Sequence, residues 1–184
     1  MWLDGLYMAA PFYAAYTALF QPGNTTAWDD ILLQFELFEA HCRDKTTGML
    51  RHRYDESKRA VWADQETGAS PHVWIRAQGW YLMALLDVLE WFPRDHRGWV
   101  KLKGWFLDLA RALKREQDSS GGWWLVMDGG YPGQKGNYIE NSGTAMYTYG
   151  LLKGARNGLF AEEEKAGYVE VARRAYGLMV EGRV

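Results

Sequence analysis

The chain has 184 residues, about the length of one domain, and its 21 Lys and Arg against 23 Asp and Glu leave a formal charge of −2. This near balance excludes the basic surface typical of nucleic-acid binders, and the 48% of hydrophobic residues excludes a disordered chain. The single cysteine, Cys42, excludes an internal disulfide framework, and the sequence holds no Cys and His cluster with metal-ligand spacing.

The first two predicted helices form a pair. The first runs from about Trp2 to Phe20 and ends at Pro22-Gly23. Its apolar stretch is shorter than the ~20 residues of a membrane span, and the chain start has no basic segment typical of a signal peptide. We therefore expect a cytoplasmic protein with no membrane partner. The second helix covers roughly Ala27 to Cys42, with Thr26 as its N-cap, and is apolar on one side only.

Four more helices are predicted further along the chain. The third spans about Val73 to Phe92, and its second half is apolar on nearly every side. The fourth, about Arg97 to Glu116, is amphipathic again. The fifth, about Ile139 to Lys153, carries small and apolar residues, and the sixth covers about Ala161 to Val180. Helices 1, 3 and 5 are thus expected to be largely buried, while helices 2, 4 and 6 each keep one solvated face.

That alternation predicts an all-α fold of the α/α toroid type, in which an outer ring of helices wraps an inner ring. An irregular helical bundle is the alternative. A short internal repeat favours the toroid, because the three inner helices begin alike, with an aromatic residue two positions before an ionisable one. The three pairs are Trp2 and Asp4, Trp74 and Arg76, and Tyr138 and Glu140.

Two long connections, residues 43–72 and 117–137, each precede an inner helix and are rich in Gly, Trp, Tyr and His. Because both lead into the start of an inner helix and the other connections are short, we expect them at one end of the ring. Function usually lies on such loops above a rigid scaffold. The residues with useful chemistry at that end are Asp4, His52, Tyr54, Asp55, Trp62, Trp74, Arg76, Gln78, Trp80, Asn137, Tyr138 and Glu140.

This mixture suits an anionic carbohydrate. Indoles cover the apolar face of a sugar ring, a guanidinium binds a carboxylate, and a carboxylic acid with a raised pKa donates a proton. Each residue also has a structural explanation. Asp4 suits a helix start, His52 a structural hydrogen bond, and Arg76 an ion pair with an acid on an inner helix. Trp74 and Trp80 suit core packing equally well.

Four segments, in chain order, resemble the unsaturated rhamnogalacturonyl hydrolases of glycoside hydrolase family 105. They are Trp2-Leu3-Asp4, His52, the block Trp74-Ile75-Arg76-Ala77-Gln78-Gly79-Trp80, and Asn137-Tyr138-Ile139-Glu140-Asn141-Ser142. The resemblance implies an (α/α)6 barrel of twelve helices, of which this chain holds about six. Residues 1–184 are therefore expected to be the central part of a single barrel domain. The missing half of the barrel, which in the family supplies a further carboxylate, or self-association is expected to cover the apolar flanks.

The resemblance also implies a glycosidase for 4,5-unsaturated galacturonyl residues of rhamnogalacturonan (pectin) oligosaccharides, which hydrates the vinyl ether double bond. Asp4 then matches the general acid/base. The matching substrate-binding residues are His52, Trp74, Arg76, Trp80 and Tyr138. No metal or organic cofactor is implied, and the expected partner is an unsaturated uronyl oligosaccharide. The alternatives are an unsaturated glucuronyl hydrolase for glycosaminoglycan fragments, a non-catalytic sugar-binding module, and a sugar epimerase on the same barrel.

Overall fold

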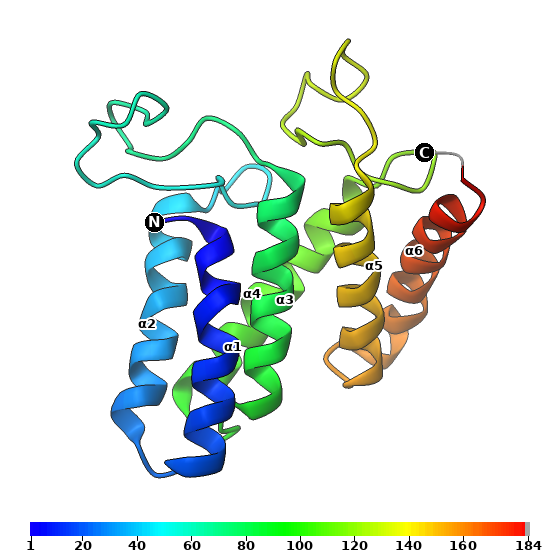
Figure 1. Cartoon of the computed structure of the whole chain (residues 1–184). Coiled ribbons are helices and arrows are strands. Elements are labelled where there is room, and N and C mark those ends of the chain that lie inside the picture. The colour runs from blue at the N-terminus through cyan, green and yellow to red at the C-terminus, as the bar shows by residue number, and fades with distance from the viewer. Residues whose placement is uncertain (183–184) are drawn as a thin grey trace.

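The computed structural model describes residues 1–182, which form six helices joined by loops (Figure 1). Within this range no strand occurs, and the loops are tied together by five isolated antiparallel bridges. The prediction of an all-α chain is therefore confirmed. The helices are α1 (Leu3–Phe20), α2 (Thr25–Cys42), α3 (Ile75–Trp91), α4 (Arg97–Arg115), α5 (Asn141–Arg156) and α6 (Glu162–Val180).

The helices form two layers. Helices α1, α3 and α5 lie side by side in one row, with α3 in contact with both of the others. Behind them, α2 packs on α1, α4 on α3 and α6 on α5. This arrangement is the inner and outer row expected of half an α/α toroid. Among the described residues, no helix combines the length and the apolar character that crossing a membrane requires.

Two details of the helix starts differ from expectation. The N-cap of α2 is Asn24 and not Thr26, because the Asn24 side chain accepts a hydrogen bond from the Ala27 amide at 3.1 Å. The repeat at the inner helices also changes register. Trp2 and Trp74 are the N-caps of α1 and α3, whereas α5 has Glu140 as its N-cap, two residues after Tyr138. The third unit is thus shifted by two residues against the other two.

The expected burial of the inner helices holds for α3 but not for α1. Helix α3 has neighbours on both sides and behind it, so its apolar second half is enclosed. Helix α1 is at the edge of the row, and Met8, Phe12 and Phe20 are 62%, 74% and 69% exposed. The predicted uncovered apolar flank is therefore present, and it runs along α1.

Glycine residues let α3 and α5 approach closely. A Cβ atom at Gly143 would lie 2.4 Å from Cγ1 of Ile75, and one at Gly79 would lie 2.4 Å from Sδ of Met146. Side chains larger than hydrogen at these positions would push the two helices apart. The close approach brings the starts of α3 and α5 together, at the end of the molecule where both long loops lie (Figure 1).

Candidate functional site

The first long loop crosses above the starts of α1 and α3 and fixes His52 beside Asp4. The Leu3 amide donates a hydrogen bond to the His52 carbonyl at 3.2 Å, and the His52 amide donates to the His72 carbonyl, also at 3.2 Å. An antiparallel bridge joins Trp2 to the residue after His52. Backbone contacts on both sides of His52 therefore set its position above the first turn of α1.

Asp4 and His52 form the centre of the candidate site. Oδ2 of Asp4 lies 3.3 Å from Nε2 of His52, close enough for an ion pair but not aligned for a hydrogen bond. The His52 ring is buried between Trp2 and Trp74, whose ring centroids lie 5.2 and 4.7 Å away and which meet it edge-on. The Asp4 side chain remains 34% exposed, so a ligand has access to its carboxyl group.

The surroundings of Asp4 keep it ionised. Partial burial raises the pKa of Asp4, but the contact with His52 and the charges of His52 and Arg76 outweigh burial and place that pKa below its ordinary value. The expectation of a raised pKa for a proton-donating acid is therefore wrong for the unliganded chain. The Asp4 carboxyl group is a carboxylate at neutral pH.

Replacing His52 with phenylalanine is expected to raise the pKa of Asp4. The ring packing between Trp2 and Trp74 is retained, but the contact and the charge that lower this pKa are lost, while burial remains. Titration of the Asp4 carboxyl carbon by NMR measures the shift. His41→Phe is the matched control, because His41 stacks on Tyr54 away from Asp4. An unchanged Asp4 titration in His52→Phe would contradict the explanation.

Arg76 is held by Glu140 and Trp74. Its Nη1 lies 3.3 Å from Oε1 of Glu140, and its guanidinium carbon lies 4.2 Å from the centroid of Trp74. Glu140 is buried and also caps α5, accepting hydrogen bonds at 2.7 Å from the Ser142 hydroxyl and from the Gly143 amide. The structural explanation of Arg76, an ion pair with an acid at an inner helix, is therefore confirmed.

Trp80 and Tyr138 are placed differently from the other predicted site residues. Trp80 is half-buried and packs on Tyr7 with ring centroids 4.8 Å apart, about 9 Å further along α3 than Trp74. Tyr7 follows Asp4 by three positions on α1, so Trp80 borders the same helix face through Tyr7. Tyr138 is 53% exposed, and within residues 1–182 its side chain has neither a hydrogen bond nor a ring contact. The structure thus does not bring Tyr138 into the cluster.

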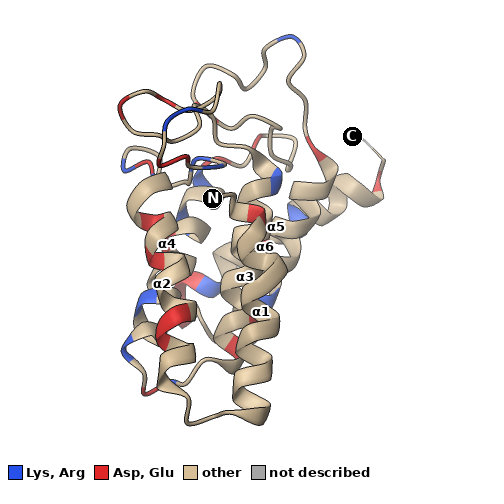
Figure 2. Cartoon of the chain, turned by 60° about the vertical axis from the view of Figure 1, so that its left-hand side comes forward, with Lys and Arg blue, Asp and Glu red and all other residues tan. Residues whose placement is uncertain are grey.

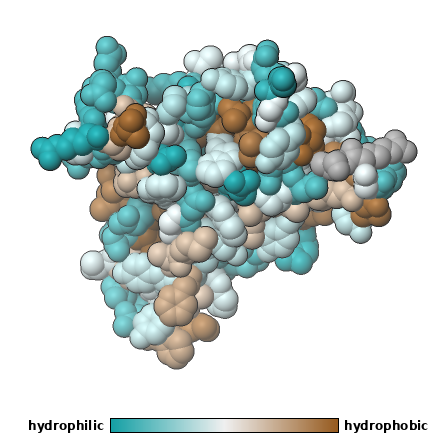
Figure 3. Space-filling model, turned by 45° about the horizontal axis from the view of Figure 1, so that its top comes forward, coloured by the Kyte–Doolittle hydropathy of each residue, from teal (hydrophilic) through white to brown (hydrophobic). Residues whose placement is uncertain are grey.

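A cavity of about 300 Å³ opens beside His52 and Trp74, between the two long loops. Figure 3, which views the loop end, shows apolar residues between loops whose outer parts are hydrophilic. The candidate residues predicted from the sequence include Trp62 but not Arg53, although Arg53 directly follows His52 in the sequence. The residues that line the cavity are His52, Arg53, Trp62, Ser70, Pro71, His72, Trp74, Leu125 and Val126.

Arg51 and Asp128 tie the two loops together. Arg51 donates hydrogen bonds to Asp44 at 2.7 Å and to Asp128 at 2.6 Å. Asp128 also accepts a hydrogen bond from the Val73 amide at 2.8 Å, just before α3. These contacts join the segments on either side of the cavity, so its walls are held in place before any ligand binds. Among the described residues, no group of three or more His, Cys, Asp or Glu is arranged to hold a metal ion.

The comparisons with known proteins identify the family and the fold. The model of Glycosyl Hydrolase Family 88 matches residues 1–184. Protein Atu3128 of Agrobacterium fabrum is 35% identical over 177 residues, and the unsaturated rhamnogalacturonyl hydrolase YesR of Bacillus subtilis is 25% identical over 155 residues. The solved structure of a glycoside hydrolase from family 105 of C. acetobutylicum superposes with a TM-score of 0.88 at 44% identity.

The chain covers its relatives to different extents. The matches include 96% of this chain for the Agrobacterium protein, 84% for the Bacillus subtilis enzyme and 98% for the C. acetobutylicum structure. They span 73% of the Agrobacterium protein, but 41% of the Bacillus subtilis enzyme and 48% of the C. acetobutylicum structure. The described fold thus corresponds to about half of the two longer proteins.

Proposed function

The chain belongs to Glycosyl Hydrolase Family 88, and from this premise we propose that the protein hydrates the double bond of 4,5-unsaturated galacturonyl residues in rhamnogalacturonan oligosaccharides. The observation that carries the proposal is the accessible Asp4 carboxylate, 3.3 Å from His52, a histidine that packs against two indoles and lines a cavity. The resemblance to family 105 is confirmed by the 44% identical structure. The substrate choice follows the name of the Bacillus subtilis relative.

In the proposed reaction Asp4 acts first as an acid and then as a base. Its carboxyl group gives a proton to C4 of the double bond, and a water molecule adds its oxygen to C5. The proton released by that water returns to the Asp4 carboxylate. The product is a hemiketal at C5, which opens and releases the neighbouring sugar. Protons and electrons balance without a metal, an oxidant or a reductant.

Asp4 needs a proton before it donates one, and the resting structure holds it as a carboxylate. Substrate binding favours protonation of Asp4, because a uronate bound next to Asp4 places a second negative charge there and raises the pKa of Asp4. His52 then stabilises the carboxylate that forms once the proton has left. Trp74 covers the sugar ring, Trp80 extends the aromatic surface, and Arg76 contacts the uronate or its neighbour.

Residues 1–184 form the central part of one barrel domain in this proposal. The support is that the match spans 48% of the C. acetobutylicum structure, and that the exposed apolar side of α1 needs a cover. The remaining helices of the barrel, or a second copy of the chain, lie against α1. Within the complete barrel, a further carboxylate from those helices faces Asp4, as the resemblance to family 105 implies.

Loss of the ultraviolet absorbance of the conjugated double bond tests the function. We expect the protein to consume an unsaturated disaccharide from rhamnogalacturonan faster than one from a glycosaminoglycan. Faster consumption of the disaccharide from a glycosaminoglycan would instead identify the protein as an unsaturated glucuronyl hydrolase. Binding of both compounds with no loss of absorbance would identify a non-catalytic sugar-binding module and overturn the proposal.

A further inference from the structure

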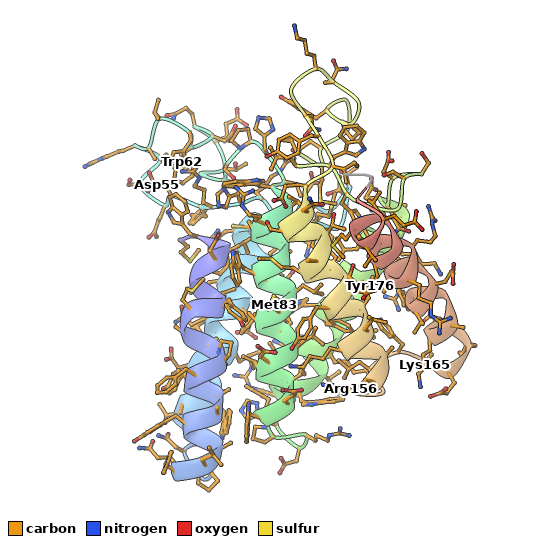
Figure 4. All side chains as sticks on the ribbon, turned by 45° about the vertical axis from the view of Figure 1, so that its right-hand side comes forward. Asp55, Trp62, Met83, Arg156, Lys165 and Tyr176 are labelled. Carbon is orange, nitrogen blue, oxygen red and sulfur yellow. The ribbon has the colours of Figure 1, made fainter. Side chains whose placement is uncertain are left out.

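Arg53 is a cation in contact with two aromatic rings. Its guanidinium carbon lies 4.3 Å from the ring centroid of Trp2 and 4.6 Å from that of Trp62. Figure 4 shows Trp62 on the first long loop, above the inner helices. The two indoles stabilise the guanidinium by cation–π contacts, which leave its N–H groups to find hydrogen-bond acceptors elsewhere.

Those N–H groups have no acceptor. Within residues 1–182 the Arg53 side chain makes neither a hydrogen bond nor an ion pair, and its Nε is buried without a partner. The two terminal nitrogens of Arg53 are not buried as Nε is, and the Arg53 side chain lines the cavity beside His52. The accessible terminal N–H groups of Arg53 therefore have no acceptor among the described residues, and an anion bound in the cavity would supply one.

The other arginines near the cavity are already paired. Arg51 bonds to two carboxylates, of Asp44 and Asp128, and Arg76 pairs with Glu140. Figure 2 shows basic and acidic residues interspersed on the loops, and among the described residues that line the cavity Arg53 is the one Lys, Arg, Asp or Glu. The unbalanced charge at the cavity is therefore a local property of Arg53.

We propose that Arg53 forms an anion subsite for an acidic group on a sugar beyond the unsaturated uronyl ring. The group is a carboxylate or a sulfate ester, both of which match the edge of a guanidinium. It lies beyond the uronyl ring because Arg53 lines the cavity beside His52, whereas Asp4 is not among the residues that line this cavity. The cavity, at about 300 Å³, is at the lower end of the ~300–1,000 Å³ usual for ligand pockets. This inference rests on the proposed function, which places the uronyl ring at Asp4.

The test measures binding in the absence of turnover. Calorimetry on the full chain carrying Asp4→Asn compares three unsaturated uronides. The first is a disaccharide with a neutral second sugar, the second a disaccharide with a sulfated second sugar, and the third a trisaccharide in which a second uronate follows the second sugar. Arg53→Met is expected to weaken binding of at least one acidic compound by about 10- to 100-fold, the value of a charge-assisted hydrogen bond, and that of the neutral one by less than about 2-fold. The compound that loses affinity identifies the acidic group.

Arg59→Met is the matched control, because Arg59 is exposed on the same loop and its side chain has no partner among the described residues. Equal losses for all three compounds, or no loss for any, would overturn the subsite. Where Arg53→Met does not fold, Arg53→Lys replaces it, since lysine keeps the charge but not the two-pronged edge. The proposed function fails separately, if the chain with Asp4 intact leaves the absorbance of every compound unchanged.

Discussion

Replacing Asp4 with asparagine is expected to lower kcat for hydration of the unsaturated uronyl bond by about 10²- to 10⁴-fold, the usual contribution of general acid–base catalysis. Asparagine has nearly the same shape as aspartate and fits the space beside His52, but it has no proton to give to C4 and no carboxylate to take one from water. Loss of the double-bond absorbance under saturating substrate measures the effect. KM is expected to change much less, since the substrate contacts remain.

The control for Asp4→Asn is Glu163→Gln, which removes one negative charge from an exposed position on α6. That variant is expected to keep full activity. If the Asp4→Asn variant has a kcat within about 3-fold of that of the unaltered protein and an unchanged melting temperature, Asp4 is not the general acid/base. The lowered pKa of Asp4 would then reflect its contact with His52 and the nearby charges without a role in the reaction.

Replacing Glu140 with alanine is expected to lower the free energy of unfolding by about 2–4 kcal/mol, from the loss of a helix cap and of a largely buried ion pair. Glu140 accepts hydrogen bonds from the Gly143 amide and the Ser142 hydroxyl, and pairs with Arg76 at 3.3 Å. Without Glu140, the half-buried guanidinium of Arg76 keeps its contact with Trp74 but has no counter-charge. Urea unfolding at equilibrium measures the change.

Two further variants separate the contributions of Glu140. Glu140→Gln keeps an oxygen for the amide of Gly143 but removes the charge, so it isolates the ion pair from the cap. Arg76→Met, combined with Glu140→Gln in a double-mutant cycle, gives the interaction energy of the pair. A destabilisation below about 0.5 kcal/mol in Glu140→Ala would show that neither contact stabilises the fold, since surface changes fall in that range.

The helices could be predicted because their signals are local. Apolar residues at helical spacing set α2 and α4, and the continuous apolar second half of α3 indicated a helix enclosed on all sides. The ends were less well predicted, since they depend on single side chains. Asn24 takes the N-cap of α2 in place of Thr26, and Glu140 moves the start of α5 to Asn141.

The candidate site was predicted in part. Asp4, His52, Trp74 and Arg76 do lie together, as their order along the chain and the resemblance to family 105 indicated. Tyr138 was expected beside them, but it is 53% exposed and its side chain makes no hydrogen bond or ring contact with the described residues. Helix α5 begins two residues later in the repeat than α1 and α3 do. The spacing of the aromatic and ionisable residues is the same in all three units, so the sequence repeat gives no sign of this shift.

The sequence by itself determined the helix periodicity, the two long loops and the residue types available at one end of the molecule, because these depend on neighbours a few positions apart. The tertiary structure alone decided which charges are balanced. Arg76 meets Glu140 across 64 positions, and Arg51 meets Asp128 across 77, while Arg53 meets two indoles and no carboxylate. Such pairings arise only when packed helices and folded loops bring distant segments into contact, and among the described residues they leave one of these three arginines without a counter-charge.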